Sequence, residues 1–171
     1  MNEPEFSRPM RLDTIGAGSR TVEIVAEPDE LAALARRFGL LGMKRLDATA
    51  ELVRSGEEVS AIGRLRAEVE QPCVASGEPV PATIDEPFAL RFIPEDETSG
   101  EEIELDEGDL DVLPYAGGAI DLGETVAQTL ALALDPFPRS PDAETALRAA
   151  GVIDEEEAGP FSALKVLRDR L

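Results

Sequence analysis

Residues 44–69, KRLDATAELVRSGEEVSAIGRLRAEV, contain the pattern that decides the fold. Apolar and polar side chains alternate on both sides of the turn Ser55-Gly56-Glu57, and a period of two is typical of strands with one buried face. Two long strands joined by a tight turn predict an antiparallel hairpin. The apolar positions that we expect to face the core are Leu46, Ala48, Ala50, Leu52, Val59, Ala61, Leu65, Ala67 and Val69.

Further strands are predicted on both sides of this hairpin. The same alternation indicates a third long strand over residues 82–93, with Pro87 marking an edge or a bulge. Shorter strands are expected at residues 8–15, 21–26 and 110–115. We therefore predict an α+β fold, either an antiparallel β-meander or a partly closed barrel, with short amphipathic helices packed on one face.

Helices are predicted from their start and stop signals. Residues 28–30 place a proline and two acids in a first turn, and Gly39 ends that helix. Asp121 fits an N-cap, and Glu124 completes the spacing of a capping box. We interpret both residues as structural first. Shorter helices are expected over residues 140–151 and 161–171.

Negative charge dominates the composition. The chain has 36 acidic and 16 basic residues, a formal net charge of −20, and thirteen Asp and Glu between Pro94 and Pro138 with no Lys or Arg among them. We predict an acidic mobile loop at residues 94–111 and an acidic linker at 152–160, because neither has enough apolar residues to offset ordering entropy. Such a surface repels phosphate backbones and attracts basic partners.

Two binding hypotheses follow from these charges. The first is that acidic side chains engage a basic protein partner. The alternative is direct RNA binding by arginines on the solvent face of the sheet. The candidate partner-binding residues are Glu101, Glu102, Glu104, Asp106, Asp109 and Asp111. The candidate RNA-binding residues are Arg64, Arg66 and Arg91.

Several other functions are not expected. The chain has no histidine and a single cysteine, Cys73, so we predict no disulfide, no metal site, no cofactor, no small-molecule substrate and no enzyme activity. Cys73 follows a strand and is interpreted as a small packing residue rather than a reactive thiol. With no long apolar run and no signal-like N-terminus, we expect a single cytoplasmic domain over residues 1–171, without membrane contact.

Two segments resemble a known family. They are residues 71–80, QPCVASGEPV, followed by the strand containing Phe88, and residues 120–124, IDLGE, continuing to Asp135-Pro136. With the closing helix at Phe161, this order is similar to that of the YceD family, the large ribosomal RNA subunit accumulation proteins, from about Arg8 to Leu171. The family markers are Cys73, Pro79, Val80, Asp121 and Leu122.

The chain departs from the common family pattern at two places. Gln128 stands where many members have glutamate, and residues 136–141 replace a cysteine-rich segment. No metal role is therefore carried over to this chain. The resemblance implies a non-enzymatic factor in large-subunit ribosomal RNA accumulation and ribosome biogenesis, and it supplies no catalytic residues. With this resemblance, the basic partner would be a ribosomal protein or an rRNA-processing factor, and RNA would be affected indirectly.

Overall fold

The computed structural model describes residues 4–16, 18–95 and 111–152. The chain forms two compact units. The first comprises Met1–Gln71 and Pro81–Asp135, and the second comprises Pro72–Val80 and Pro136–Leu171. The predicted linker beyond Val152, the predicted last helix and most of the predicted acidic loop lie outside the described residues.

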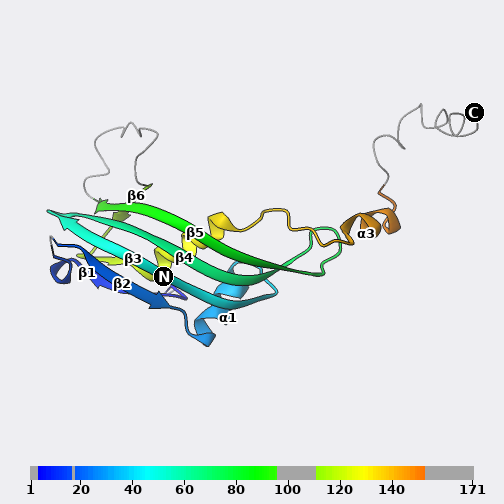
Figure 1. Cartoon of the computed structure of the whole chain (residues 1–171), viewed down its shortest axis with the longest axis horizontal. Coiled ribbons are helices and arrows are strands. Elements are labelled where there is room, and N and C mark those ends of the chain that lie inside the picture. The colour runs from blue at the N-terminus through cyan, green and yellow to red at the C-terminus, as the bar shows by residue number, and fades with distance from the viewer. Residues whose placement is uncertain (1–3, 17, 96–110, 153–171) are drawn as a thin grey trace, which may run out of the picture. The chain divides into compact units, whose positions relative to one another are not determined.

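A five-stranded sheet has the strand order β2-β3-β4-β5-β6 (Figure 1). Within it, β3 pairs antiparallel with β2 and with β4. The predicted hairpin is confirmed, with Ser55 opposite Glu58 and Gly56 at φ 66° in the turn. A positive φ of this kind favours glycine, which explains the residue at that position. The strands are β2 Arg20–Val25, β3 Gly42–Ser55, β4 Glu58–Pro72, β5 Pro79–Pro94 and β6 Asp111–Tyr115.

The last strand differs from the predicted meander. β6 was expected as a strand and is one, but it pairs parallel with β5, from Leu90 opposite Asp111 to Pro94 opposite Tyr115. Parallel neighbours need a long connection, and residues 95–110 supply it here. The α+β class is confirmed, while the sheet is mixed and, within the described residues, open rather than closed into a barrel.

Two helices cover the buried face of this sheet. They are α1 Pro28–Arg37 and α2 Leu122–Ala133. The predicted start of α1 is confirmed, with proline at its beginning and a reciprocal capping box between Glu27 and Glu30. Both helices contribute apolar side chains to the same core as the strands.

The core follows the alternation in the sequence. All nine apolar positions predicted from the hairpin are at most 2% exposed. Gly63 occupies an inward position of the same alternation, and a Cβ there would lie 2.2 Å from the Thr49 carbonyl oxygen and 2.7 Å from Phe88 Cζ. The missing side chain therefore makes room for the Phe88 ring. The other side chains with no exposed surface are Phe6, Leu34, Val126, Ala127 and Leu130.

A separate two-stranded sheet ties the N-terminal segment to α2. It pairs β1 Pro9–Arg11 with β7 Ala119–Asp121. The strand predicted over residues 8–15 is shorter than expected, because a 3₁₀ turn begins at Leu12. The Leu12 amide donates to the Gly118 carbonyl, and the Leu12 carbonyl accepts from Arg54, so the backbone bonds of Leu12 are made to neighbouring turns and side chains.

Candidate interaction surfaces

The acidic segment, residues 95–111, joins β5 to β6 and carries ten carboxylates and no basic residue. Five of the six predicted partner-binding residues, Glu101, Glu102, Glu104, Asp106 and Asp109, lie outside the described residues. The sixth, Asp111, is exposed at the start of β6, and Glu95 is exposed just after β5. Both ends of the segment are therefore held at one parallel strand pair.

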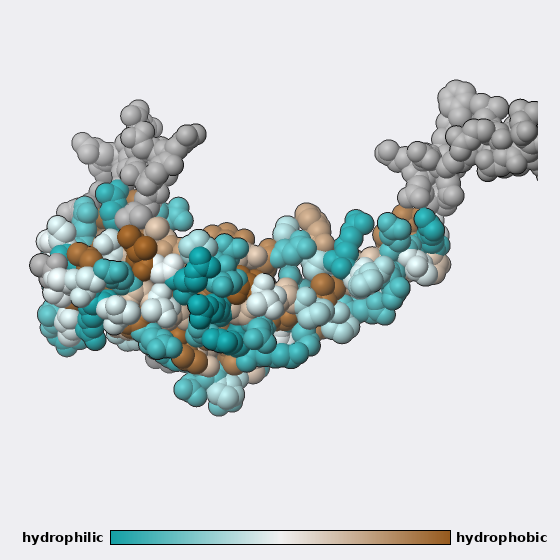
Figure 2. Space-filling view, in the orientation of Figure 1, coloured by the Kyte–Doolittle hydropathy of each residue, from teal (hydrophilic) through white to brown (hydrophobic). Residues whose placement is uncertain are grey.

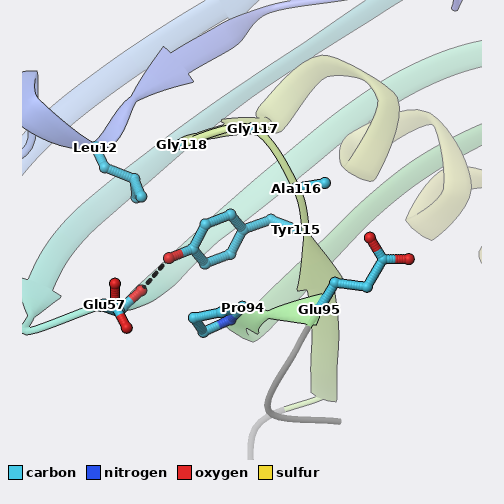
Figure 3. Close-up of a pocket in the computed structure, with 8 residues that line it drawn as sticks. All are labelled: Leu12, Glu57, Pro94, Glu95, Tyr115, Ala116, Gly117 and Gly118. Carbon is cyan, nitrogen blue, oxygen red and sulfur yellow. Dashed lines mark hydrogen bonds between the residues drawn. The ribbon is translucent and has the colours of Figure 1, made fainter. Parts of the chain in front are cut away.

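A pocket of about 290 Å³ lies at the same place, where β5 ends and β6 turns toward β7 (Figure 3). The Tyr115 side chain reaches across it, and its hydroxyl donates to the Glu57 carbonyl at 2.7 Å. Gly117 and Gly118 both have positive φ, 74° and 72°, which a two-residue turn of this hand requires. The lining residues are Leu12, Glu57, Pro94, Glu95, Tyr115, Ala116, Gly117 and Gly118.

A second hollow, of about 530 Å³, shares Leu12, Gly117 and Gly118 with this pocket. Its own charged residues are Arg11, Asp13 and Arg54. Arg11 binds Asp13 through two hydrogen bonds, which lower the pKa of the Asp13 carboxyl. Arg54 donates to the Leu12 and Gly56 carbonyls, so it holds the two turns together.

The predicted RNA-binding arginines lie among carboxylates. Arg64 binds Asp85 at 2.7 Å and lowers the pKa of that carboxyl, while Arg66 approaches the same residue at 3.9 Å and stands opposite Asp47 in the strand register. Arg91 is half-buried on β5. The alternation of the strands places all three on the outer face of the sheet, as predicted, but Arg64 and Arg66 are next to negative charge.

The outer face as a whole has no cationic surplus. By strand alternation and register, its described residues include four arginines and seven carboxylates, and Lys44 pairs with one of these carboxylates, Glu70, at 2.7 Å. Figure 2 shows a mosaic of hydrophilic and neutral residues with scattered hydrophobic ones. The arginines are Arg45, Arg64, Arg66 and Arg91, and the carboxylates are Glu23, Asp47, Glu51, Glu58, Glu68, Glu70 and Asp85.

Asp121, a family marker, joins three elements. Its carboxylate caps α2 by accepting the Glu124 amide at 3.1 Å, which confirms the predicted N-cap. The same carboxylate accepts from the Ser7 hydroxyl at 2.6 Å and the Arg8 amide at 2.7 Å. The neighbouring marker Leu122 is 1% exposed in the core. Both markers therefore have structural roles.

The next two residues fix the N-terminal segment against α2. A Cβ on Gly123 would lie 2.5 Å from the Phe6 carbonyl oxygen, so only glycine allows this approach. Glu124 was expected to complete a capping box, but its carboxylate binds Arg37 at 2.7 and 2.8 Å. This hydrogen-bonded ion pair lowers the pKa of Glu124. Arg8 makes a similar two-bond pair with Glu30.

In the second unit, Cys73 anchors a turn to the segment before α3 Ala143–Ala149. Its side chain is 3% exposed, and its sulfur accepts the Ser140 amide at 3.3 Å. Hydrogen bonds from Ser140 and then Ser76 lower the pKa of the thiol to about 6, although burial alone would raise it. The family markers Pro79 and Val80 begin β5 directly after this turn.

Metal-binding clusters and membrane-spanning helices are both absent from the residues that the structure describes. No group of three or more Cys, Asp and Glu side chains gathers there as a potential metal centre. Within the same ranges, no helix has the length and apolar character needed to cross a bilayer.

Together these features define an acidic α+β protein with an open mixed sheet and charged surfaces. A family model described as large ribosomal RNA subunit accumulation protein YceD matches residues 62–168. The match covers more than half of the chain and includes both marker segments, so the chain belongs to this family. The family name implies a role in accumulation of large-subunit ribosomal RNA.

No curated protein and no solved structure matches the chain. The family match begins at residue 62, whereas we expected the resemblance from about Arg8. The segment that holds Ser7 and Arg8 therefore lies outside the match, although these residues bind the Asp121 marker.

Sequence reasoning missed the residues whose role depends on distant partners. Ser7 and Arg8 meet Asp121 across more than 110 positions, and no local pattern marks them. Tyr115 is the single tyrosine of the chain, and the two glycines that follow it predict a turn but not a pocket.

Proposed function

We propose that this protein is a non-enzymatic cytoplasmic factor in the accumulation of large-subunit ribosomal RNA. In this proposal it acts as an acidic adaptor for a basic ribosomal or rRNA-processing protein. Family membership is the observation that supports a role in ribosomal RNA accumulation. The net charge of −20 supports the mechanism, since a surface of that sign attracts basic proteins and repels RNA.

The distribution of ion pairs directs attention to the acidic segment. Several of the basic residues already bind carboxylates within the fold, as in the pairs Arg8–Glu30, Arg37–Glu124 and Arg64–Asp85. The acidic segment contributes ten carboxylates with no basic residue among them. A basic partner would supply the positive charge that the sequence of this segment lacks, and its binding would weaken as salt increases.

Direct RNA binding by the outer sheet face has less support. Arg64 and Arg66 lie within 2.7 and 3.9 Å of Asp85, and carboxylates outnumber arginines on that face. A phosphate approaching these arginines would also meet the carboxylates, so few phosphates would be neutralised.

The adaptor proposal is tested with the full chain immobilised and purified large-subunit ribosomal proteins added in solution. A variant with Glu101→Gln, Glu102→Gln, Glu104→Gln and Asp106→Asn removes four charges from the acidic segment. We expect the wild-type chain to retain basic ribosomal proteins at low salt and to release them as salt rises, and the variant to retain several-fold less. Equal retention by both proteins at low salt would remove the adaptor mechanism.

A further inference from the structure

The pocket at Tyr115 has the size and lining for one side chain of a partner. Its volume of about 290 Å³ is at the lower limit for sites that enclose whole small molecules. Leu12 and Pro94 supply apolar wall, and Figure 3 places the Tyr115 ring between them. A long side chain with an apolar stem would find complementary surface here.

The charges at this pocket are negative. Glu57 and Glu95, both exposed, line it. Figure 3 places Glu57 at the hydroxyl end of the Tyr115 ring and Glu95 on the opposite side, with its carboxylate directed away from the ring. A planar guanidinium binds carboxylates through paired hydrogen bonds and also lies favourably over a tyrosine ring. An ammonium offers neither the planar fork nor the same stacking.

The arginines of the neighbouring hollow do not reverse this charge. Arg11 is matched by Asp13, and Arg54 donates to two backbone carbonyls. Across the two hollows, three carboxylates, of Glu57, Glu95 and Asp13, face two guanidinium groups. The sequence that continues from Glu95 adds further negative charge.

We propose that the pocket lined by Tyr115, Glu57, Glu95, Leu12 and Pro94 binds an arginine side chain of a basic protein partner. This inference rests on the proposed function, since it names how a basic partner is recognised beyond general attraction. Long-range charge would bring the partner to this end of the sheet, and the pocket would select arginine over lysine.

The test compares two peptides by calorimetry and by amide NMR of the full chain. Both alternate lysine and glycine, and they differ only at the centre, where one has arginine and the other has lysine, so that the two peptides carry the same charge. We expect the arginine peptide to bind about three- to tenfold more tightly. It should also shift the amide signals of Leu12 and of residues 115–118.

Charge-removing variants connect the preference to the pocket. The double variant Glu57→Gln with Glu95→Gln should abolish the preference for arginine. The matched control, Glu23→Gln with Glu86→Gln, removes the same charge from exposed strand positions outside the pocket. This control variant should still bind the arginine peptide more tightly than the other peptide. Amide spectra of each variant check that it is folded.

The outcomes separate the two proposals. If both peptides bind equally and salt-sensitively, the pocket inference is overturned while the adaptor mechanism stands. If neither peptide binds, the pocket inference is also overturned, and the adaptor is then judged by the ribosomal-protein experiment. A preference for arginine that survives in the Glu57→Gln, Glu95→Gln variant would place the site elsewhere and contradict the inference.

Discussion

The start of α2 and the acidic segment use negative charge in opposite ways. At the start of α2, each carboxylate has a partner within the fold: Asp121 binds Ser7 and Arg8, and Glu124 binds Arg37. In residues 95–111, ten carboxylates occur without one basic residue in the sequence. The first arrangement explains stability, and the second is the better candidate for recognition.

This comparison changes how the family markers are interpreted. Asp121 and Leu122 are the most recognisable residues of the chain, yet their contacts are with the N-terminal segment, the α2 backbone and the core. Cys73 likewise anchors a turn. We infer that these markers identify the fold, whereas binding specificity depends on less distinctive residues.

The largest effect is expected from Asp121→Ala. The substitution removes the α2 cap and two further hydrogen bonds to a carboxylate, so we expect a loss of about 3 kcal/mol in the free energy of unfolding. Urea titration measures it. The control is Asp142→Ala, because Asp142 precedes α3 without a side-chain cap bond and its replacement should cost below about 0.5 kcal/mol. If Asp121→Ala and Asp142→Ala lowered the free energy of unfolding equally, the hydrogen bonds that join Asp121 to the N-terminal segment and α2 would not stabilise the fold as described.

Gly123→Ala should have the next largest effect. The new Cβ would overlap the Phe6 carbonyl, and relieving such overpacking costs about 1–3 kcal/mol. Gly18→Ala is the control, since a Cβ there meets nothing within 4 Å. Thermal unfolding of both variants is the measurement. A Gly123→Ala protein as stable as Gly18→Ala would mean that the N-terminal segment does not pack as closely on α2 as described.

The ion pairs Arg37–Glu124 and Arg8–Glu30 predict how the free energy of unfolding depends on pH. Arg37 lowers the pKa of Glu124, and Arg8 lowers that of Glu30, so both groups hold protons less readily when folded than when unfolded. Their contribution is therefore complete above the unfolded pKa of about 4.3 and is lost as pH falls through the folded values. Urea midpoints between neutral and acidic pH should fall less steeply for Glu124→Gln than for the wild type. If the urea midpoints of Glu124→Gln and the wild type fell equally steeply with pH, the Arg37–Glu124 pair would not contribute to the pH dependence of stability.

The smallest effect on stability is expected from the acidic segment. Neutralising Glu101, Glu102, Glu104 and Asp106 should change the free energy of unfolding by less than about 0.5 kcal/mol, because it removes charges that the sequence does not balance locally. Urea titration on the variant used for partner binding checks this. A loss as large as that of Asp121→Ala would show that the acidic segment is structural and would erase the contrast between the two regions.

The sequence predicts those elements that depend on local periodicity. The β3–β4 hairpin, α1 and α2 were predicted because alternation, capping residues and turn glycines lie within each segment. The parallel pairing of β6 with β5 was not predicted. It depends on the connection through residues 95–110 and on which edge of the sheet remains for β6, and neither is a local pattern. The strand predicted at residues 8–15 is shorter in the structure because Arg54 and Gly118, which are distant in the sequence, bind Leu12.

The candidate surfaces show the same division. Alternation correctly placed Arg64 and Arg66 on the solvent face, but the partner of both, Asp85, comes from the next strand and cannot be paired with them from spacing alone. The acidic segment is evident from composition. The pocket combines Leu12, Glu57 and Tyr115 from three separate parts of the chain, which only the folded structure brings together.

The most direct measurement of the central claim is the ratio of large- to small-subunit ribosomal RNA in cells that lack the gene. We predict that the ratio falls, that the wild-type gene restores it, and that the gene with Glu101→Gln, Glu102→Gln, Glu104→Gln and Asp106→Asn does not, although its product is folded and present at the wild-type level. Full restoration by this variant would contradict the claim that the acidic segment carries the function, and an unchanged ratio in the deletion strain would contradict the proposed function itself.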